Sequence, residues 1–144
     1  MSEPAGLPLE LRLGLRAGSV FYFEARELHS TEPHYFVVAN RDPLGRRLVL
    51  LAVFSSQLEK IRLRNRTRPE TVVEISPVDY AELKTLSAVD CNVIFRRSLD
   101  EMTTLVRQHR VRYHRDLPVA VVEKIRAAIV ASPVVDPEDK ELVK

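Results

Sequence analysis

Three short runs of β-forming residues, each followed by residues that favour turns, constrain the fold of this chain most strongly. The runs cover residues 20–24, 35–39 and 47–54. They are rich in Val, Phe and Tyr, which pack well on a pleated surface. Residues 40–45 read Asn-Arg-Asp-Pro-Leu-Gly, and Asn, Asp, Pro and Gly each favour a turn for a separate reason. The pattern predicts strands, with the last two joined as a hairpin.

The strand region is expected to continue. Residues 71–75 and 87–95 are predicted to be strands, and residues 78–83 a short helix behind a Ser-Pro start signal. Residues 58–68 fit either a ragged strand or a basic loop. Several short strands that precede any long helix predict a small barrel or a rolled sheet.

The spacing of apolar residues then changes to the helical period. Ser98 and Glu101 form the capping-box pattern, which predicts a helix that ends near residue 108. Residues 111–114 are expected to be extended, and Asp116 is expected to cap a second, longer helix whose apolar residues recur at helical spacing. We expect these helices to cover an open face of the sheet or to form a surface for a partner.

These patterns place the chain in the α+β class as a single domain, residues 1–144, with a barrel-like core in residues 1–97 and a helical arm in residues 98–144. A length of 144 residues fits one domain, and an apolar content of 45% is enough for a core. The lone Cys91 excludes an internal disulfide. No apolar run is long enough to span a membrane, and the N-terminus lacks the basic start of a signal peptide. We therefore expect a cytoplasmic protein.

The motifs of common cofactor and metal sites are absent from the sequence. Neither the dinucleotide-binding nor the P-loop glycine pattern occurs, so no nucleotide cofactor is predicted. Cys91 lies beside Asp90, whose charge would raise the thiol pKa, so a packed cysteine is favoured over a nucleophile. No metal site is predicted either, because a zinc site needs three or four ligands and the histidines stand apart from cysteines and carboxylate clusters; they are His29, His34, His109 and His114.

Four arginines alternate in residues 61–68, and this is the strongest local charge feature. If the segment is extended, Arg62, Arg64, Arg66 and Arg68 share one side, which would suit phosphate groups. The alternative is a solvated basic loop. The net charge of only +2 does not itself require a nucleic-acid partner.

Four segments together resemble the MazF/PemK family of toxin ribonucleases from toxin–antitoxin pairs. Residues 18–23 (Gly-Ser-Val-Phe-Tyr-Phe) resemble the opening strand of the family, and residues 33–40 (Pro-His-Tyr-Phe-Val-Val-Ala-Asn) its second strand. Residues 54–57 (Phe-Ser-Ser-Gln) resemble the family's Cys-Thr-Thr/Ser-Gln motif, and residues 87–92 its closing strand. Their order and spacing match the family, whereas the helical region after them is covered poorly.

The resemblance implies an SH3-like β-barrel with short helices and a longer helical extension. It also implies a homodimer that an antitoxin protein inhibits, and an endoribonuclease that cuts single-stranded RNA without a metal or another cofactor. In that reaction the ribose 2′-hydroxyl attacks the adjacent phosphate. The chemistry needs a base, an acid and donors that stabilise the phosphorane.

Carrying the family's functional residues over gives a partial site. The family's threonine at the scissile phosphate falls on Ser55, and its acidic position falls on Asp90. Its main catalytic arginine falls on Pro33, so the neighbouring His34 is expected to act in its place as acid, base or cation. The resemblance thus implies His34, Ser55 and Asp90 as catalytic residues, and Ser56, Gln57, Arg62 and Arg64 as substrate-binding residues.

The leading interpretation is therefore a toxin that cleaves single-stranded RNA. One alternative is a non-catalytic barrel of the same fold that binds protein or RNA, because the family's arginine is missing. Another is a small regulatory or structural protein whose arginine stripe binds an acidic partner helix.

Overall fold

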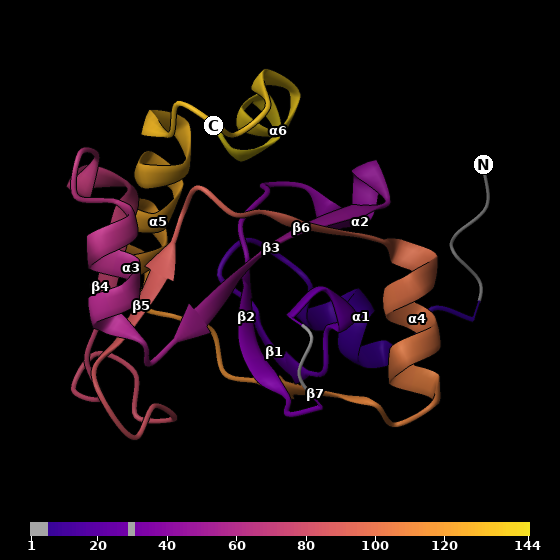
Figure 1. Cartoon of the computed structure of the whole chain (residues 1–144). Coiled ribbons are helices and arrows are strands. Elements are labelled where there is room, and N and C mark those ends of the chain that lie inside the picture. Colours follow the sequence, from indigo (N-terminus) through magenta and orange to yellow (C-terminus); the bar gives the residue numbers. More distant parts are fainter. Residues whose placement is uncertain (1–5, 29–30) are drawn as a thin grey trace.

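The computed structural model describes residues 6–28 and 31–144 (Figure 1). Within these residues the α+β prediction is confirmed. The strands are β1 (Val20–Phe23), β2 (His34–Val38), β3 (Leu48–Ser55), β4 (Val72–Ile75), β5 (Ser87–Asp90), β6 (Phe95–Ser98) and β7 (Val111–His114). The α-helices are α1 (Leu9–Gly14), α2 (Pro43–Arg46), α3 (Leu58–Arg64), α4 (Leu99–Arg107), α5 (Val119–Ala131) and α6 (Pro137–Val143), with short 3₁₀ turns at Arg26–Leu28 and Pro69–Thr71.

The strands form one antiparallel sheet in the order β4-β5-β3-β2-β1-β7, and β6 also pairs with β3. The long strand β3 shares one edge between two partners. Its first half pairs with β6, where Leu51 lies opposite Phe95, and its end pairs with β5, where Phe54 lies opposite Val89. Because β3 changes partner along its length, the sheet curls into a small open barrel. Strands β2 and β3 form the predicted hairpin.

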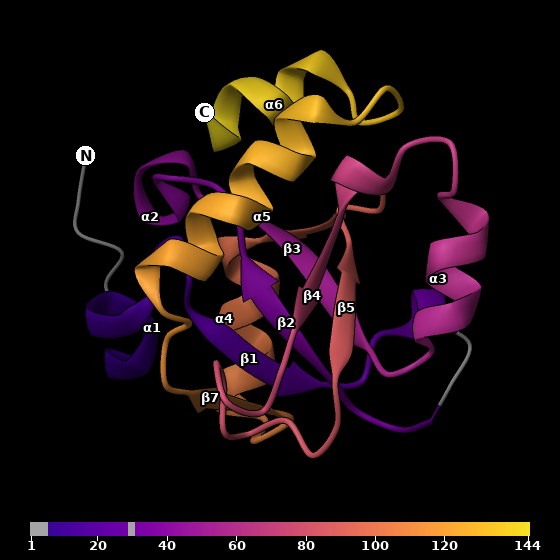
Figure 2. The same ribbon diagram turned by 90° about the vertical axis from the view of Figure 1, so that its left-hand side faces the viewer.

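Both faces of the central strands are covered. Phe21 and Phe36 pack on one side with Met102 of α4, whereas Val20 packs on the other side with Ile125 of α5. Figures 1 and 2 show these two helices on opposite sides of β1 and β2. This double coverage explains why the strands read as continuous apolar runs rather than as an alternation of apolar and polar residues.

The residues after Ser98 contribute to the sheet and to its apolar core. Strand β7 pairs with β1, and Ile125 and Ile129 of α5 are fully buried against the sheet. Arg96 on β6 contacts the buried Asp139 of α6 at 2.5 Å. The C-terminal residues thus complete the sheet and the core rather than extending from it. None of the helices in the described residues is both long and apolar enough to cross a membrane.

Several local predictions differ from the structure. The single strand predicted over residues 87–95 is divided into β5 and β6, because the chain turns at residues 91–94. In the segment with alternating arginines, residues 58–64 form helix α3, which points Ile61 into the protein, and only residues 65–68 form a turn or loop. The turn predicted at residues 40–45 contains the short helix α2, and its N-cap Asp42 accepts a hydrogen bond from the amide of Gly45. The helix predicted at residues 78–83 is a series of turns.

The two long C-terminal helices differ in how they begin. Ser98 and Glu101 exchange both hydrogen bonds of the predicted capping box at the start of α4. Asp116, by contrast, does not cap α5; it accepts hydrogen bonds from Arg16 and from the hydroxyl of Tyr113. The prediction of a cap rested on the position of Asp116 alone. In the structure Asp116 links Tyr113 of β7 to Arg16 of the N-terminal segment.

Candidate functional site

A cleft of about 690 Å³ opens where the beginning of β2 meets the ends of β1 and β3. The antiparallel registers bring these ends together, because Tyr22 lies opposite Tyr35, and Phe36 lies opposite Val53. Residues 82–85, from the loop between β4 and β5, line the remaining side. With Arg112 of β7, the cleft is assembled from five separate stretches of the chain.

Four of the residues proposed from sequence line this cleft, namely His34, Ser55, Ser56 and Gln57. The Ser55 hydroxyl oxygen accepts the amide N–H of Gln57 at 3.1 Å, and no acceptor within the described residues takes the hydroxyl proton. The imidazole Nδ1 of His34 lies 3.1 Å from the backbone oxygen of Glu32. Because a carbonyl oxygen can only accept, a hydrogen bond here requires the tautomer with the proton on Nδ1, in which Nε2 is the nitrogen that can act as a base.

Aromatic side chains form one wall of the cleft. The rings of Tyr22 and Tyr35 lie 4.5 Å apart between centroids, and Phe54 lies beyond Tyr35 at 6.5 Å. Burial, together with the nearby Tyr22 and Glu82, raises the pKa of Tyr35, so its phenol stays neutral near pH 7. Such rings offer flat faces on which nucleobases can stack.

Arg112 brings a cation to the cleft that the sequence analysis missed. It lies on β7 opposite Tyr22, and its guanidinium carbon is 5.1 Å from the centroid of that ring. It forms no ion pair with any of the described residues. The extended conformation of residues 111–114 was predicted correctly, but pairing with a strand far away in the chain left no local signal. Lys84 adds a second exposed cation from the loop.

Two acidic residues, Glu32 and Glu82, also line the cleft. Glu82 accepts a hydrogen bond from Arg115 at 3.0 Å and lies 3.9 Å from Nδ1 of His114. Arg115 partly compensates the charge of Glu82, and the cleft presents the cations Arg112 and Lys84 to an anionic ligand.

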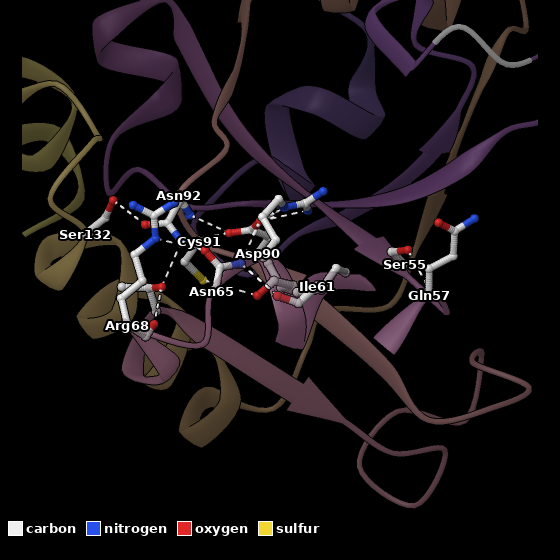
Figure 3. A network of polar contacts seen from close by, with 12 residues as sticks. Ser55, Gln57, Ile61, Asn65, Arg68, Asp90, Cys91, Asn92 and Ser132 are labelled. Atoms are coloured by element: carbon white, nitrogen blue, oxygen red, sulfur yellow. Dashed lines mark hydrogen bonds and ion pairs between the residues drawn. The ribbon is translucent and has the colours of Figure 1, made fainter. Parts of the chain in front are cut away.

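Asp90 lies outside the cleft, in a buried polar cluster that Figure 3 shows apart from Ser55 and Gln57. One carboxylate oxygen accepts bonds from Arg64 at 2.8 Å and Asn65 at 3.1 Å, and the other accepts two bonds from Asn92. Burial opposes ionisation, but these hydrogen bonds outweigh it and lower the pKa of Asp90. The structure therefore does not bring Asp90 together with His34 and Ser55.

The arginines of α3 are also held away from the cleft. Arg62 donates two hydrogen bonds of 2.7 Å to the carboxylate of Glu74, and Arg64 pairs with Asp90. Arg68, just after the helix, donates to the side-chain oxygen of Asn65 at 2.9 Å. The predicted stripe does not exist, because α3 turns Arg64 by about 200° from Arg62, and Arg66 and Arg68 follow the helix in a turn and loop.

Metal and thiol chemistry receive no support from the described part of the chain. It contains no group of three His, Cys, Asp or Glu side chains placed to hold a metal ion. His29, considered above as a ligand, lies outside the described residues. Burial, with a smaller contribution from Asp90, raises the pKa of the Cys91 thiol to about 12, so this cysteine stays protonated in the core.

Comparison with known proteins gives a structural match only. No family model and no curated protein matches the sequence. Among solved structures, an endoribonuclease in complex with its cognate antitoxin from mycobacterial species superposes with a TM-score of 0.54 at 16% sequence identity. The match covers 82% of this chain and 93% of that chain. The chain therefore shares the fold of that endoribonuclease, and the small-barrel prediction is confirmed.

Proposed function

We propose that this protein is an endoribonuclease that cleaves single-stranded RNA, and that it acts as the toxin of a toxin–antitoxin pair. The observation that carries the proposal is one cleft in which His34, the Ser55–Gln57 segment, Arg112 and two contacting tyrosines, Tyr22 and Tyr35, converge. The fold shared with an endoribonuclease that binds an antitoxin supports it. Arg112 supplies, from another strand, the cation that Pro33 cannot.

The cleft offers groups for each step of the reaction. Nε2 of His34 takes the proton of the ribose 2′-hydroxyl, whose oxygen then bonds to the adjacent phosphorus. Arg112 and the Ser55 hydroxyl donate to the non-bridging oxygens as charge develops on the phosphorane. The bond from phosphorus to the 5′-oxygen breaks, and this oxygen takes a proton from Lys84 or from water. The products are a 2′,3′-cyclic phosphate and a 5′-hydroxyl, and the reaction needs no metal.

Base stacking explains a preference for single strands. Tyr22 and Tyr35 line the cleft, and unpaired bases stack on aromatic side chains for about 1–3 kcal/mol each. In a duplex the faces of the bases are already stacked on neighbouring bases and cannot reach the protein. The cleft therefore suits an unpaired segment of RNA.

Cleavage of a fluorescently labelled RNA by the purified protein tests this proposal. We expect fragments that end in a cyclic phosphate, formed in the presence of EDTA, and no cleavage when the 2′-hydroxyls are replaced by hydrogen. His34→Ala should slow cleavage about 100-fold or more, because general-base catalysis is lost. The matched control is His109→Ala, which changes an exposed histidine outside the cleft.

The same assay separates the proposal from the binding-only alternative, which the proline at the position of the family's arginine favours. RNA binding without scission would support a non-catalytic barrel. Equal rates for the His34→Ala variant and the unchanged protein would remove His34 from the mechanism. Growth arrest on expression, relieved by co-expression of a partner protein, would support the toxin assignment, and sedimentation would test the proposed homodimer.

A further inference from the structure

His114 packs against the aromatic wall of the cleft, and the reaction proposed above does not use it. It follows Arg112 by two residues on β7, so both side chains lie on the same face of the strand. Its ring lies 6.0 Å from that of Tyr22 and 5.1 Å from that of Tyr35, between centroids. Its Nε2 atom is buried and has no hydrogen-bond partner among the described residues. Buried polar atoms usually have partners, so this ring is a candidate for a role beyond packing.

Glu82 turns one of its two carboxylate oxygens toward His114. Its Oε1 accepts a hydrogen bond from Nε of Arg115 at 3.0 Å. Its Oε2 lies 3.9 Å from Nδ1 of His114, which is too far for a hydrogen bond but within the range of an ion pair. The carboxylate is therefore bound on one side, and its contact on the other side depends on the charge of the imidazole.

The backbone beside Glu82 is anchored to the end of β7. The hydroxyl of Tyr80 donates to the backbone oxygen of Arg115 at 2.6 Å. Burial, with a smaller contribution from Glu82, raises the pKa of Tyr80, so this phenol remains a donor. Leu83 is buried in the core, whereas Lys84 is exposed at the cleft. The backbone is thus fixed on both sides of Glu82, and its carboxylate is the part that can change partners.

The charged groups around this imidazole act in opposite directions. Arg112 and Arg115 disfavour a further positive charge, whereas the carboxylate of Glu82 favours it. Asp116, two residues farther along the chain, is paired with Arg16 instead. Histidine side chains gain their charge between about pH 8 and pH 5, so the contact with Glu82 is open to control by pH in that range.

We propose that His114 is a positioning residue for Glu82. When the imidazole is protonated, its Nδ1–H donates to Oε2, and the carboxylate is held against β7 between His114 and Arg115. When the imidazole is neutral, only Arg115 holds the carboxylate, and its remaining charge faces the cleft that it lines. The proton comes from solvent, and no covalent bond of the chain changes.

The consequence for the cleft rests on the proposed function. Glu82 lines the cleft together with Lys84 and Arg112, so a carboxylate that is only partly compensated opposes the binding of phosphate. A charged His114 completes the compensation. RNA should therefore bind more tightly as the pH falls, through Glu82 and without contact between His114 and the substrate.

NMR titration of the full-length protein without RNA tests the positioning directly. We expect the side-chain carboxyl carbon of Glu82 and the amides of residues 82–85 to shift with the same midpoint as the ring of His114. In Glu82→Gln the amides should no longer follow that ring. The matched control is His34→Gln, which removes the other histidine of the cleft and should leave the shifts in place. Signals of residues 82–85 that ignore the ring, or that follow it equally in Glu82→Gln, would overturn the proposal.

Binding of a 2′-O-methylated single-stranded RNA, which cannot be cleaved, tests the consequence. Between about pH 8 and about pH 6, affinity should rise about fivefold more for the unchanged protein than for His114→Gln. When residue 82 is already Gln, adding His114→Gln should make no further difference. The titration of His34 is common to all four proteins and cancels.

The two measurements fail separately. An effect of His114→Gln that is equally large with Glu or Gln at position 82 would overturn the coupling between the two residues. RNA that binds none of the four proteins would contradict the proposed function and its consequence, whereas NMR shifts shared by His114 and Glu82 would still establish the positioning.

Discussion

His109 ends helix α4 in the left-handed backbone region, with a φ angle of 57°. Its amide donates to the carbonyl of Val106, and the amide of Arg110 donates to that of Leu105, which is the Schellman pattern of a helix end. Glycine usually occupies this position, because a Cβ atom is strained there. The strain remains because the two hydrogen bonds hold the turn that leads into β7.

His109→Gly is therefore expected to raise the free energy of unfolding by about 0.5–1 kcal/mol, through relief of this strain. The midpoint of urea unfolding measures it. His109→Ala is the matched control and should give no such gain, because it keeps the Cβ atom. An equal gain from both variants would assign the effect to the imidazole rather than to the backbone.

Glu27 and the largely buried Arg97 form a bidentate ion pair, with distances of 2.7 and 2.8 Å. The hydrogen bonds from Arg97 lower the pKa of Glu27 from 4.5 to about 2. A carboxyl whose pKa is lowered by folding stabilises the protein above its unfolded pKa. That stabilisation is lost as the pH falls from about 4.5 to about 2.

Glu27→Gln should accordingly make the free energy of unfolding depend less steeply on pH under acid conditions. At neutral pH it should lower that free energy by about 1 kcal/mol, because solvent partly screens the carboxylate. Urea unfolding at a series of pH values between neutral and strongly acid conditions measures both effects. An unchanged dependence on pH would show that the ion pair contributes nothing in solution.

Helix α3 is attached to the rest of the protein by polar contacts more than by apolar packing. Ile61 is its buried apolar residue, whereas Leu63 is 64% exposed. Asn65, just after the helix, donates to Asp90 and accepts from Asn92, whose side chain in turn accepts from Ser132 after α5 (Figure 3). Because α3 directly follows Gln57, this cluster also fixes one border of the cleft.

Asp90→Ala should therefore destabilise the protein by about 2–4 kcal/mol, since it leaves a side-chain N–H of the buried Asn65 and the backbone N–H of Asn92 without their acceptor. Arg64→Met is the matched control and should cost about 1 kcal/mol or less, because that side chain is mostly exposed. Urea unfolding measures both variants. A small loss for Asp90→Ala would mean that the cluster rearranges around the missing carboxylate.

Local patterns in the sequence predict elements well where burial and spacing agree. Strands β1 to β3 and the capped start of α4 are examples, because apolar β-formers and the Ser98–Glu101 pair act over a few residues. Helix α3 was missed because alternating arginines imitate a strand when their partners, Glu74 and Asp90, are unknown. At the cleft, His34 and the Ser55–Gln57 segment were identified by motif. Arg112 reaches the cleft only because β7 pairs with β1, and no local sequence pattern predicts that long-range pairing.

At the scale of the whole molecule, β3 connects the parts. It pairs with β2 along one edge and with β6 and β5 in succession along the other, so both halves of the sheet and both cores meet on it. A change at the middle of β3 is therefore expected to affect the whole fold, whereas a change in α6 affects only one side. The cleft lies at the end of this strand, where Ser55 follows the buried Phe54.

The pairing of β1 with β7 has a further consequence for the order in which the protein matures during synthesis. A ribosome releases β1 long before β7, so the nascent chain holds the aromatic residues of β1 without their second neighbouring strand until residues 111–114 have been made. Arg112 arrives with that late strand. If the cleft acts on RNA as proposed, a nascent chain that has not yet reached β7 is inactive, and the polysome that translates it is protected from its own product until that strand has paired with β1.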